Sequence, residues 1–180
     1  MRALLIVDML NDFLTGSLKC ERAFHIVPNI EKAASAFRAK RLPVIYCNDA
    51  HLKDIDGELA LWGEHAIKGT EGAEVIEDLK PQAEDYIVPK RRYSCFFGTD
   101  LDMLLRELRA DEVVLTGLHA NLCVRHTAAD AYFLGYKITV LGDCVEALSQ
   151  EDYDSGLEYV RKYYGARIAT SAELMEEIRL

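Results

Sequence analysis

A cysteine stands at the point where an apolar segment gives way to a helix-like one. The apolar run 112–116 ends in the turn-like stretch 117–121, and Cys123 follows at the start of a helix expected over about 122–134. If Asn121 caps this helix, the unpaired N–H groups of the first turn and the helix dipole favour a thiolate and lower the pKa of Cys123. The thiol is then a candidate nucleophile, although a small buried core cysteine is the commoner use of this residue type.

A carboxylate and an ammonium group occupy similar places elsewhere in the chain. Asp8 directly follows the apolar run 3–7, and Lys90 follows the apolar run 86–88. A carboxylate can take the proton of a thiol, and an ammonium group can stabilise the resulting anion. Asp8, Lys90 and Cys123 would therefore form a nucleophilic unit if the fold brings them together. Taken singly, Asp8 is equally a cap or a loop acceptor for backbone N–H groups, and Lys90 is a surface lysine.

Short apolar runs alternate with amphipathic segments along the chain. Because each strand is followed by a helix, the pattern predicts an α/β fold whose mainly parallel sheet, of about six strands, is covered on both faces. The strands are expected at 3–7, 43–47, 86–88, 112–116, 137–141 and 167–170. The helices are expected at 28–40, from 99 to 109, at about 122–134, from 149 and from 171, with capping boxes at 99–102 and 149–152. A single domain over residues 1–180 is expected.

The residues at the carboxyl ends of these strands are chemically rich. In open parallel sheets a ligand binds beyond those ends, near the point where the strand order reverses. The residues expected there are Asp8, Asp49, Lys90, His119 to Cys123, and Asp143. The segment 51–70 is a long excursion with little periodicity, and long loops of this kind are commonly functional.

The composition argues against several classes of partner and site. The formal net charge is −9, whereas a nucleic-acid or anionic-membrane partner requires a basic face, so we expect neither partner. The five cysteines are widely spaced and lack a Cys-x-x-Cys pair, which argues against a disulfide framework or zinc ribbon and favours a reducing compartment. With no signal-peptide pattern and no apolar run of roughly 18 residues, a cytoplasmic protein is expected.

The motifs that are present, together with those that are absent, favour one family. There is no Gly-x-Ser-x-Gly elbow, P-loop or Gly-x-Gly-x-x-Gly fingerprint. Five segments occur in a characteristic order: VDMLNDF (7–13), NDAH (48–51), WGEHAIKGT (62–70), KRRYSCF (90–96) and GLHANLCV (117–124). With them the chain resembles the isochorismatase-like cysteine hydrolases, the superfamily of nicotinamidase and N-carbamoylsarcosine amidase.

The resemblance implies a catalytic triad of Asp8, Lys90 and Cys123 on a Rossmann-like, three-layer α/β/α fold. It also implies a cis peptide bond between Leu118 and His119. In the resembled enzymes this arrangement aims the backbone N–H groups at the positions of His119 and Cys123 towards a developing oxyanion.

A metal site is a further implication of the resemblance. Asp49, His51 and His65 match metal-ligand positions of the nicotinamidases, and such a ligand set suits a divalent, zinc-like ion. The usual further His downstream of His51 is missing, and Asp54 or Asp56 occupies that neighbourhood. A carboxylate could substitute for that His; alternatively no metal binds, and Asp49 and His51 hydrogen-bond the loop. The cysteine chemistry itself requires no cofactor.

Four other positions bear on the substrate pocket. Phe13 and Trp62 match positions that line the pocket in the resembled enzymes, although Phe13 is equally an ordinary core aromatic. Leu10 and Ala120 depart from the family pattern, in which Gln and Thr are frequent at these two positions.

These features predict an amidohydrolase that cleaves a C–N bond of a small amide or N-carbamoyl compound through a thioester-type intermediate and releases ammonia. An N-carbamoylsarcosine-like substrate is favoured by the incomplete metal set and by Arg91 or Arg92, which could pair with a substrate carboxylate. Nicotinamide is the alternative substrate, favoured by the possible metal ligands and by Trp62.

Other classes of protein stay open at this point. A thiol-redox protein would use Cys123 with a resolving partner such as Cys95. A metal-dependent hydrolase would rely on Asp49, His51 and His65, and a binding protein would keep the fold without the activity. Because the resembled enzymes are commonly dimers or tetramers, a homodimer or homotetramer with a small-molecule amide substrate is expected.

Overall fold

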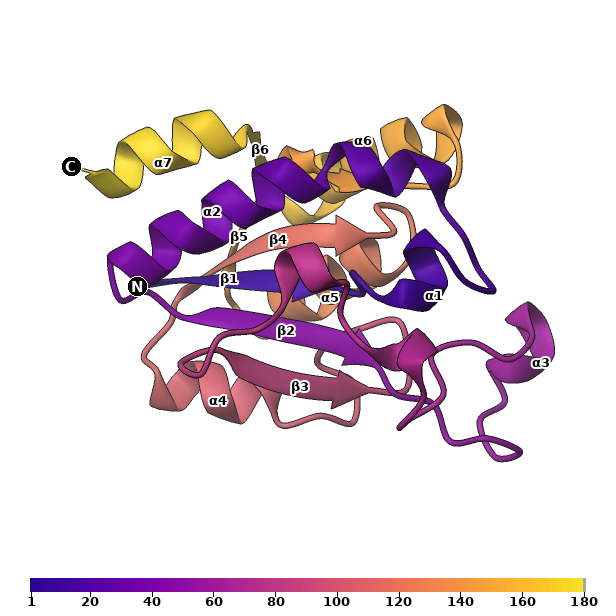
Figure 1. Ribbon diagram of the computed structural model, residues 1–180. Coiled ribbons are helices and arrows are strands. Elements are labelled where there is room, and N and C mark those ends of the chain that lie inside the picture. Colours follow the sequence, from indigo (N-terminus) through magenta and orange to yellow (C-terminus); the bar gives the residue numbers. More distant parts are fainter. Residues whose placement is uncertain (180) are drawn as a thin grey trace.

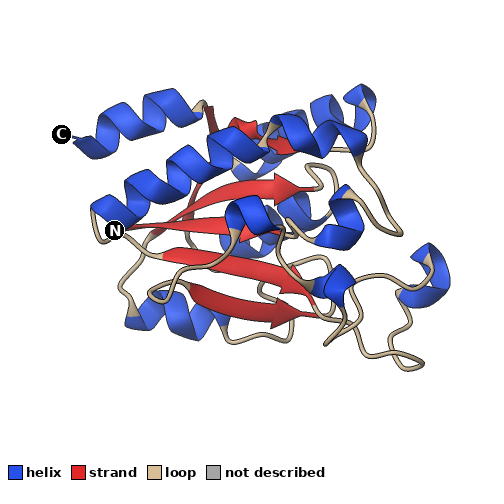
Figure 2. Ribbon diagram, viewed as in Figure 1, coloured by secondary structure: helices blue, strands red, loops and turns tan. Residues whose placement is uncertain are grey.

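Six parallel strands form one sheet in the structure of this chain, a computed structural model that describes residues 1–179 (Figure 1, Figure 2). The strands are β1 (Arg2–Val7), β2 (Val44–Asp49), β3 (Tyr86–Lys90), β4 (Glu112–Leu118), β5 (Lys137–Glu146) and β6 (Arg167–Ala169). Their order across the sheet is β3-β2-β1-β4-β5-β6, and every neighbouring pair is parallel. The predicted α/β fold with a six-stranded sheet is confirmed.

Helices cover both faces of this sheet (Figure 1). The helices are α1 (Asn11–Leu14), η1 (Glu21–His25), α2 (Val27–Ala39), α3 (Leu59–Trp62), η2 (Glu71–Ala73), η3 (Glu77–Leu79), α4 (Leu101–Glu107), α5 (Cys123–Phe133), α6 (Gln150–Tyr164) and α7 (Ser171–Arg179). α2 and α7 pack together on one face, and α5 packs with α6 on the other. β1 shows why both faces are needed. Leu4 and Ile6 belong to the core under α2, whereas Leu5 belongs to the core under α5, because successive strand side chains point to opposite faces.

The strand order reverses between β1 and β4. The chain runs outward from β1 to β2 and β3, then returns to the other side of β1 to form β4, β5 and β6. Folds of this class bind ligands in the crevice beyond the carboxyl ends of the strands at such a reversal. Asp8 follows β1, and Cys123 opens the helix that follows β4, so the topology places both residues at this crevice.

The start of α5 differs by one residue from the sequence prediction. The capping position is Leu122 rather than Asn121, so Cys123 is the first residue of the helix. Asn121 is occupied elsewhere, because its side-chain amide donates to Asp152 Oδ1 at 2.9 Å. The cysteine still lies in the first turn, where the backbone N–H groups have no acceptor within the helix.

The predicted helix cap at Ser149 forms. Ser149 Oγ accepts the N–H of Asp152 at 3.1 Å and donates to the Asp152 carboxylate at 2.7 Å, as predicted. The box expected at Thr99 is wrong. Thr99 Oγ1 accepts the N–H of Leu101 at 3.2 Å, and the carboxylate of Asp102 instead accepts from Tyr136 and Arg106. The helix there is also shorter than predicted, ending at Glu107.

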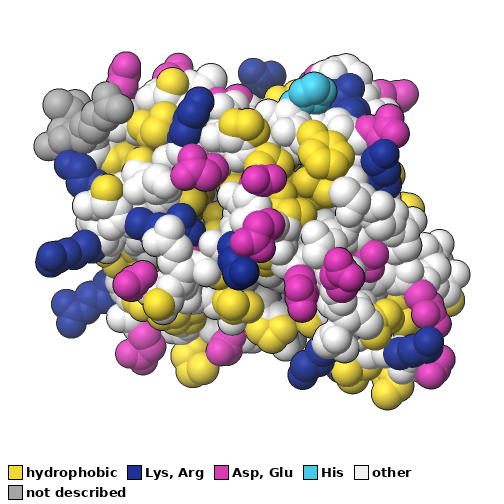
Figure 3. Space-filling model, in the orientation of Figure 1, with side chains coloured by type: hydrophobic (Ala, Val, Ile, Leu, Met, Phe, Trp, Pro, Cys, Tyr) yellow, Lys and Arg dark blue, Asp and Glu magenta, His cyan; other side chains and the backbone are white. Residues whose placement is uncertain are grey.

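Charged side chains of both signs are mixed on the surface. On the face shown in Figure 3, Lys and Arg side chains lie scattered among Asp and Glu side chains. Within residues 1–179, every helix is too short or too polar to cross a membrane. The five cysteines are all buried and carry free thiols.

Gly117 in β4 is a position where only glycine fits. Its φ is +95°, and a Cβ atom there would overlap the carbonyl oxygen of Val7, the residue before Asp8. We expect Gly117→Ala to lower the free energy of unfolding by about 2–3 kcal/mol, through backbone strain and this steric contact. Urea unfolding measures the change. Gly135→Ala is the matched control, since its φ is +81° but nothing lies within 4 Å of its Cβ position. Equal losses for the two variants would contradict the prediction.

Candidate active site

The structure brings Asp8, Lys90 and Cys123 together at the switch point. The ammonium nitrogen of Lys90 lies 2.7 Å from Asp8 Oδ2 and 3.6 Å from Cys123 Sγ. All three side chains are buried, and Cys123 is the most exposed of them at 6%. A carboxylate, an ammonium group and a thiol therefore share one small volume beyond the sheet, as nucleophilic catalysis requires.

A fourth residue, Asp49, completes this arrangement. Lys90 donates to Asp49 Oδ1 at 2.6 Å, and the backbone N–H of Asp49 donates to Asp8 Oδ1 at 2.8 Å. The strands explain the contact, because Asp49 at the end of β2 is the register partner of Lys90 at the end of β3. Lys90 thus lies between two carboxylates. The sequence prediction gave Asp49 either to a metal site or to the hydrogen bonds of the loop, and it missed the bond to Lys90.

The charges around Lys90 set the protonation states. Burial raises the pKa of Asp8 to about 7, and the Asp49 carboxylate adds to the effect while Lys90 opposes it. Burial also acts to raise the pKa of Asp49, but Lys90 and His51 outweigh it and the net shift is downward. For Lys90, burial lowers the pKa, but Asp49 and Asp8 raise it well above its usual range. At neutral pH Lys90 is thus charged, Asp49 is ionised, and Asp8 is poised to exchange a proton.

The Cys123 thiol does not behave as its helix position predicted. Burial raises its pKa well above the usual range, the Asp8 and Asp49 carboxylates raise it further, and only Lys90 acts to lower it. The expectation of a lowered pKa is therefore wrong, because the loss of solvation and two nearby anions outweigh the start of one helix. The thiol is protonated at rest and needs a base for attack.

The backbone beside Cys123 has the form that the resemblance implies. The peptide bond between Leu118 and His119 is cis. The carbonyl of His119 accepts the N–H groups of Leu122 and Val124, at 3.0 and 3.2 Å. The N–H of Cys123, the first residue of α5, is one of the groups that a helix leaves without an internal acceptor.

A cluster of four buried side chains lies next to Asp8, Lys90 and Cys123. Atoms of Asp49, His51, Glu58 and His65 that could bind a metal all lie within 4.8 Å of one another. Nε2 of His51 is buried without a hydrogen-bond partner among the described residues. Nδ1 of His65 is 2.8 Å from a backbone carbonyl, which leaves its Nε2 for the cluster. Two imidazoles and two carboxylates fit a divalent ion of the zinc, manganese or iron kind.

Glu58 is the ligand candidate that the sequence prediction missed. Asp54 or Asp56 was expected in this place, but Asp54 is exposed, and Asp56 lies 3.2 Å from Nδ1 of His51. Asp56 therefore orients His51 from outside the cluster, as carboxylates do for metal-binding histidines. Arg91 in turn donates from Nε to Asp56 at 2.9 Å, so this arginine is not free to pair with a substrate.

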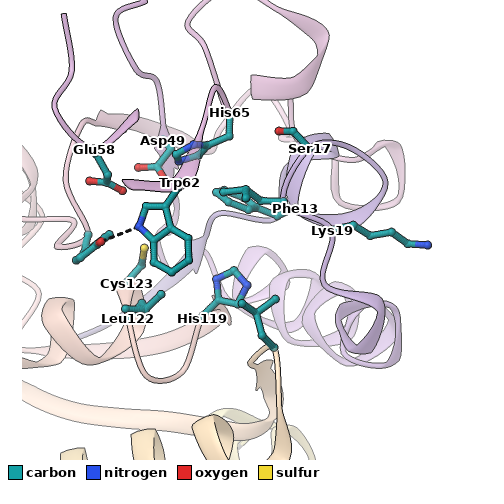
Figure 4. Close-up of a pocket in the computed structure, with 13 residues that line it drawn as sticks. Phe13, Ser17, Lys19, Asp49, Glu58, Trp62, His65, His119, Leu122 and Cys123 are labelled. Carbon is teal, nitrogen blue, oxygen red and sulfur yellow. Dashed lines mark hydrogen bonds between the residues drawn. The ribbon is translucent and has the colours of Figure 1, made fainter. Parts of the chain in front are cut away.

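A cavity of about 270 Å³ opens over Cys123 and this cluster (Figure 4). Phe13, Trp62 and Tyr93 form aromatic walls, and Trp62 Nε1 donates to the Tyr93 hydroxyl at 2.9 Å. The volume suits a small molecule. The expectation for Arg92 is wrong: it lines a neighbouring groove rather than this cavity, and its guanidinium donates to the carbonyl of Arg91.

Comparison with known proteins decides the family. The isochorismatase domain model matches residues 2–173. The chain belongs to the isochorismatase family. The predicted resemblance is confirmed, and the family assignment covers β1 to β6 together with the triad and the cluster described above.

Solved structures of isochorismatase-family relatives superpose over almost the whole chain. N-carbamoylsarcosine amidase from Thermoplasma acidophilum is 44% identical, with a TM-score of 0.89 over 94% of this chain and 96% of the other. Nicotinamidase PncA from Bacillus subtilis is 35% identical, with a TM-score of 0.89 over 93% and 98%. Pyrazinamidase of Pyrococcus horikoshii, solved in complex with zinc, is 30% identical, with a TM-score of 0.87 over 94% and 98%. The names of these relatives agree with the predicted class, a hydrolase acting on C–N bonds.

The cluster of Asp49, His51, Glu58 and His65 predicts metal binding, which can be measured without an activity assay. We expect the metal-free protein to bind Zn²⁺, and Glu58→Gln to weaken the affinity at least about 10-fold, because one anionic ligand is lost. Competition with a chromophoric chelator measures the affinity. Glu64→Gln is the control, because Glu64 lies in the same loop but is exposed and pairs with Lys53 at the surface. Unchanged affinity in Glu58→Gln would contradict a four-residue site.

Proposed function

We propose that the protein is a cysteine amidohydrolase that cleaves a C–N bond of a small amide, with N-carbamoyl amino acids of the N-carbamoylsarcosine type as its substrate class. The observation that carries the reaction type is the contact of Lys90 with both Asp8 and Cys123 beneath a small cavity. The substrate class draws support from the identity to an N-carbamoylsarcosine amidase, 44%, against 35% for a nicotinamidase.

In the first half of the reaction Asp8 is the base. As the sulfur of Cys123 attacks the amide carbon, Asp8 takes the thiol proton; its Oδ2 is buried and lies 2.7 Å from the ammonium nitrogen of Lys90. Lys90 stabilises the negative charge that passes between the sulfur and the carboxylate. The carbonyl oxygen, now an oxyanion, accepts the N–H groups of His119 and Cys123. The C–N bond then breaks, and ammonia leaves with the proton that Asp8 holds.

In the second half of the reaction water replaces the amine. Asp8, again a carboxylate, takes a proton from the water as its oxygen attacks the carbon of the thioester-type intermediate. The C–S bond breaks, the acid or carbamic acid is released, and the proton returns to Cys123. Each residue is thus restored, and Asp8 handles the proton in every step.

The cluster of Asp49, His51, Glu58 and His65 borders the same cavity through three of its members. A divalent ion held there would supply a Lewis-acidic centre that positions a substrate group or a water molecule. Asp49 joins this cluster to the triad, because it also accepts from Lys90.

A second candidate, nicotinamide hydrolysis, is favoured by one observation. The ring of Trp62 forms a flat wall beside the cluster, which suits an aromatic substrate (Figure 4). The thiol-redox alternative gains no such observation. A buried Cys123 with a raised pKa is a poor target for oxidants, which react with exposed thiolates.

Ammonia release from a panel of amides tests the proposed function. The panel contains N-carbamoylsarcosine, N-carbamoylglycine, nicotinamide and pyrazinamide, and each is assayed with the metal-loaded protein. We expect the two N-carbamoyl acids to have the highest kcat/KM. A higher value for nicotinamide would replace the substrate class with the second candidate. No ammonia from any of the four would contradict the proposed substrates altogether.

The pKa of Asp8 predicts the pH dependence of turnover. Asp8 must be ionised to take the thiol proton, and its pKa is raised to about 7. We expect kcat/KM to fall about 10-fold per pH unit below pH 7 and to level off above it, with the apparent pKa belonging to the coupled group of Asp8, Asp49, Lys90 and Cys123. A pH series at saturating metal, with the metal content measured at each pH, checks this. A flat profile from pH 5 to 8 would contradict Asp8 as the base.

A further inference from the structure

The proposed mechanism gives no role to the imidazole ring of His119. The side chain of His119 lines the cavity and is only 7% exposed, yet its Nε2 has no hydrogen-bond partner among residues 1–179. A buried polar nitrogen in this state costs about 1–3 kcal/mol, so a partner from outside the chain is expected. Nε2 of His51 is also buried without a hydrogen-bond partner, but that nitrogen faces the metal-ligand cluster.

His119 and the cluster lie on different sides of the cavity. The ring of Phe13 lies between them, with its centroid 5.8 Å from the ring of His65 and 5.8 Å from the ring of His119 (Figure 4). The contact with His119 is edge-on at 88°, which fixes the plane of the imidazole. Because the backbone N–H of His119 faces the oxyanion in the proposed mechanism, its side chain lies close to the atoms attached to the scissile carbon.

The two sides of the cavity differ in charge. The cluster side carries the carboxylates of Asp49 and Glu58. A divalent ion bound there would neutralise their two negative charges without leaving a net positive charge on that side. His119 lies on the other side of Phe13 from His65 (Figure 4), and the ammonium group of Lys19, which also lines the cavity, pairs with Glu21 at 3.1 Å. Burial, with a smaller contribution from Lys90, lowers the pKa of His119 to about 4. At neutral pH the imidazole is therefore uncharged and offers one N–H donor.

We propose that the side chain of His119 forms a subsite that binds the carboxylate of the substrate, on the side of the cavity away from the carboxylates of the cluster. Nε2–H of His119 donates to one carboxylate oxygen while the amide carbon lies over Cys123. The subsite selects N-carbamoyl amino acids and related amide acids over neutral amides of the same size. This proposal rests on the proposed function and replaces the role that the sequence prediction gave to Arg92.

A matched pair of substrates tests the subsite. N-carbamoylglycine carries the carboxylate, and its methyl ester is neutral but otherwise alike. We expect His119→Ala to raise KM for the acid about 10–100-fold more than KM for the ester, the effect of one lost hydrogen bond to a charged group, whereas any loss of kcat through the His119 backbone should be the same for both substrates. His25→Ala, an exposed histidine on η1, is the control and should change neither. Equal losses for acid and ester in His119→Ala, or no loss for either, would overturn the subsite.

Binding to an inactive protein separates this proposal from the proposed function. Calorimetry measures the affinity of N-carbamoylglycine and its ester for Cys123→Ala, and for the same protein with His119→Ala added. A 10-fold or greater loss for the acid alone supports the subsite even if the wild type releases no ammonia from any amide. Loss of acid binding in a Glu58→Gln background, but not with His119→Ala, would place the carboxylate on the cluster and overturn the proposal.

Discussion

Cys123→Ala is expected to lower kcat for ammonia release at least about 10³-fold, because in the proposed mechanism the covalent intermediate forms on the sulfur of Cys123. The fold should survive, since Cys123 lines the cavity and its replacement by Ala removes a single sulfur atom. We expect the melting temperature to stay within about 5 °C of the wild type, the shift that corresponds to about 1–2 kcal/mol in a domain of this size. Steady-state kinetics and thermal unfolding measure the two effects on one preparation.

A control variant and a double mutant sharpen this test. Cys144→Ala removes another buried thiol, one that contacts Asp143 and does not line the cavity, so its kcat should be unchanged. Asp8→Asn alone should lose most of the wild-type activity. Added to Cys123→Ala, it should lower the remaining activity very little, because the effects of residues that act as a unit are not additive. Turnover near the wild-type rate in Cys123→Ala would remove the thiol from the mechanism. It would favour a hydrolase that relies on the metal-ligand cluster.

The sheet and the triad were accessible from the sequence for one physical reason. β1 and β4 are buried on both faces and read as nearly unbroken apolar runs, and the edge strand β3 carries a short apolar run, so the ends of all three could be placed within a few residues. Parallel strands carry the residues that follow them to the same edge of the sheet. Asp8, Lys90 and Cys123 could therefore be expected at one edge of the sheet, and the family resemblance implied that they meet there.

The loop 51–70 could not be predicted in the same way. It has little regular structure beyond α3, so no periodicity indicates which of Asp54, Asp56 and Glu58 points inward. The structure decides this through contacts that are remote in sequence, above all the pairing of Arg91 with Asp56. The environment of Cys123 was hidden for a related reason. The second carboxylate, from Asp49, reaches the site only through the pairing of β2 with β3.

Asp49 makes the metal-ligand cluster and the triad one electrostatic system. Its two oxygens are divided between them, since Oδ1 accepts from Lys90 while Oδ2 lies 3.7 Å from Nε2 of His51. A cation bound beside His51 would draw charge from Asp49. It would also weaken the repulsion by which Asp49 raises the pKa of Asp8. We therefore expect metal loading to influence the base, although the metal ligands and the nucleophile are different side chains.

Lys90→Met is expected to have the largest effect on stability. Lys90 is fully buried between Asp8 and Asp49, so its replacement by an uncharged chain of similar length leaves two buried carboxylates facing one another. Breaking a buried ion pair in this way costs about 3–5 kcal/mol of unfolding free energy. Activity should be lost as well, because nothing then stabilises the anion formed at Cys123. Lys32→Met, on the exposed face of α2, is the control and should change neither property.

The pH dependence of the loss distinguishes charge from packing. Without Lys90 the folded-state pKa values of Asp8 and Asp49 rise above their unfolded values. The folded state of the variant is then destabilised by these two groups at high pH. Its stability is retained below the pKa values that the two carboxyl groups have in the unfolded state, and it is lost as the pH rises through their folded-state values. The deficit of Lys90→Met against the wild type should therefore be larger at pH 8 than at pH 5, measured by urea unfolding at both. Adding Asp49→Asn should recover part of the loss at pH 8, because it removes one of the two facing charges. A deficit that is the same at both pH values, and is not reduced by Asp49→Asn, would mean that Lys90 stabilises the fold through packing alone.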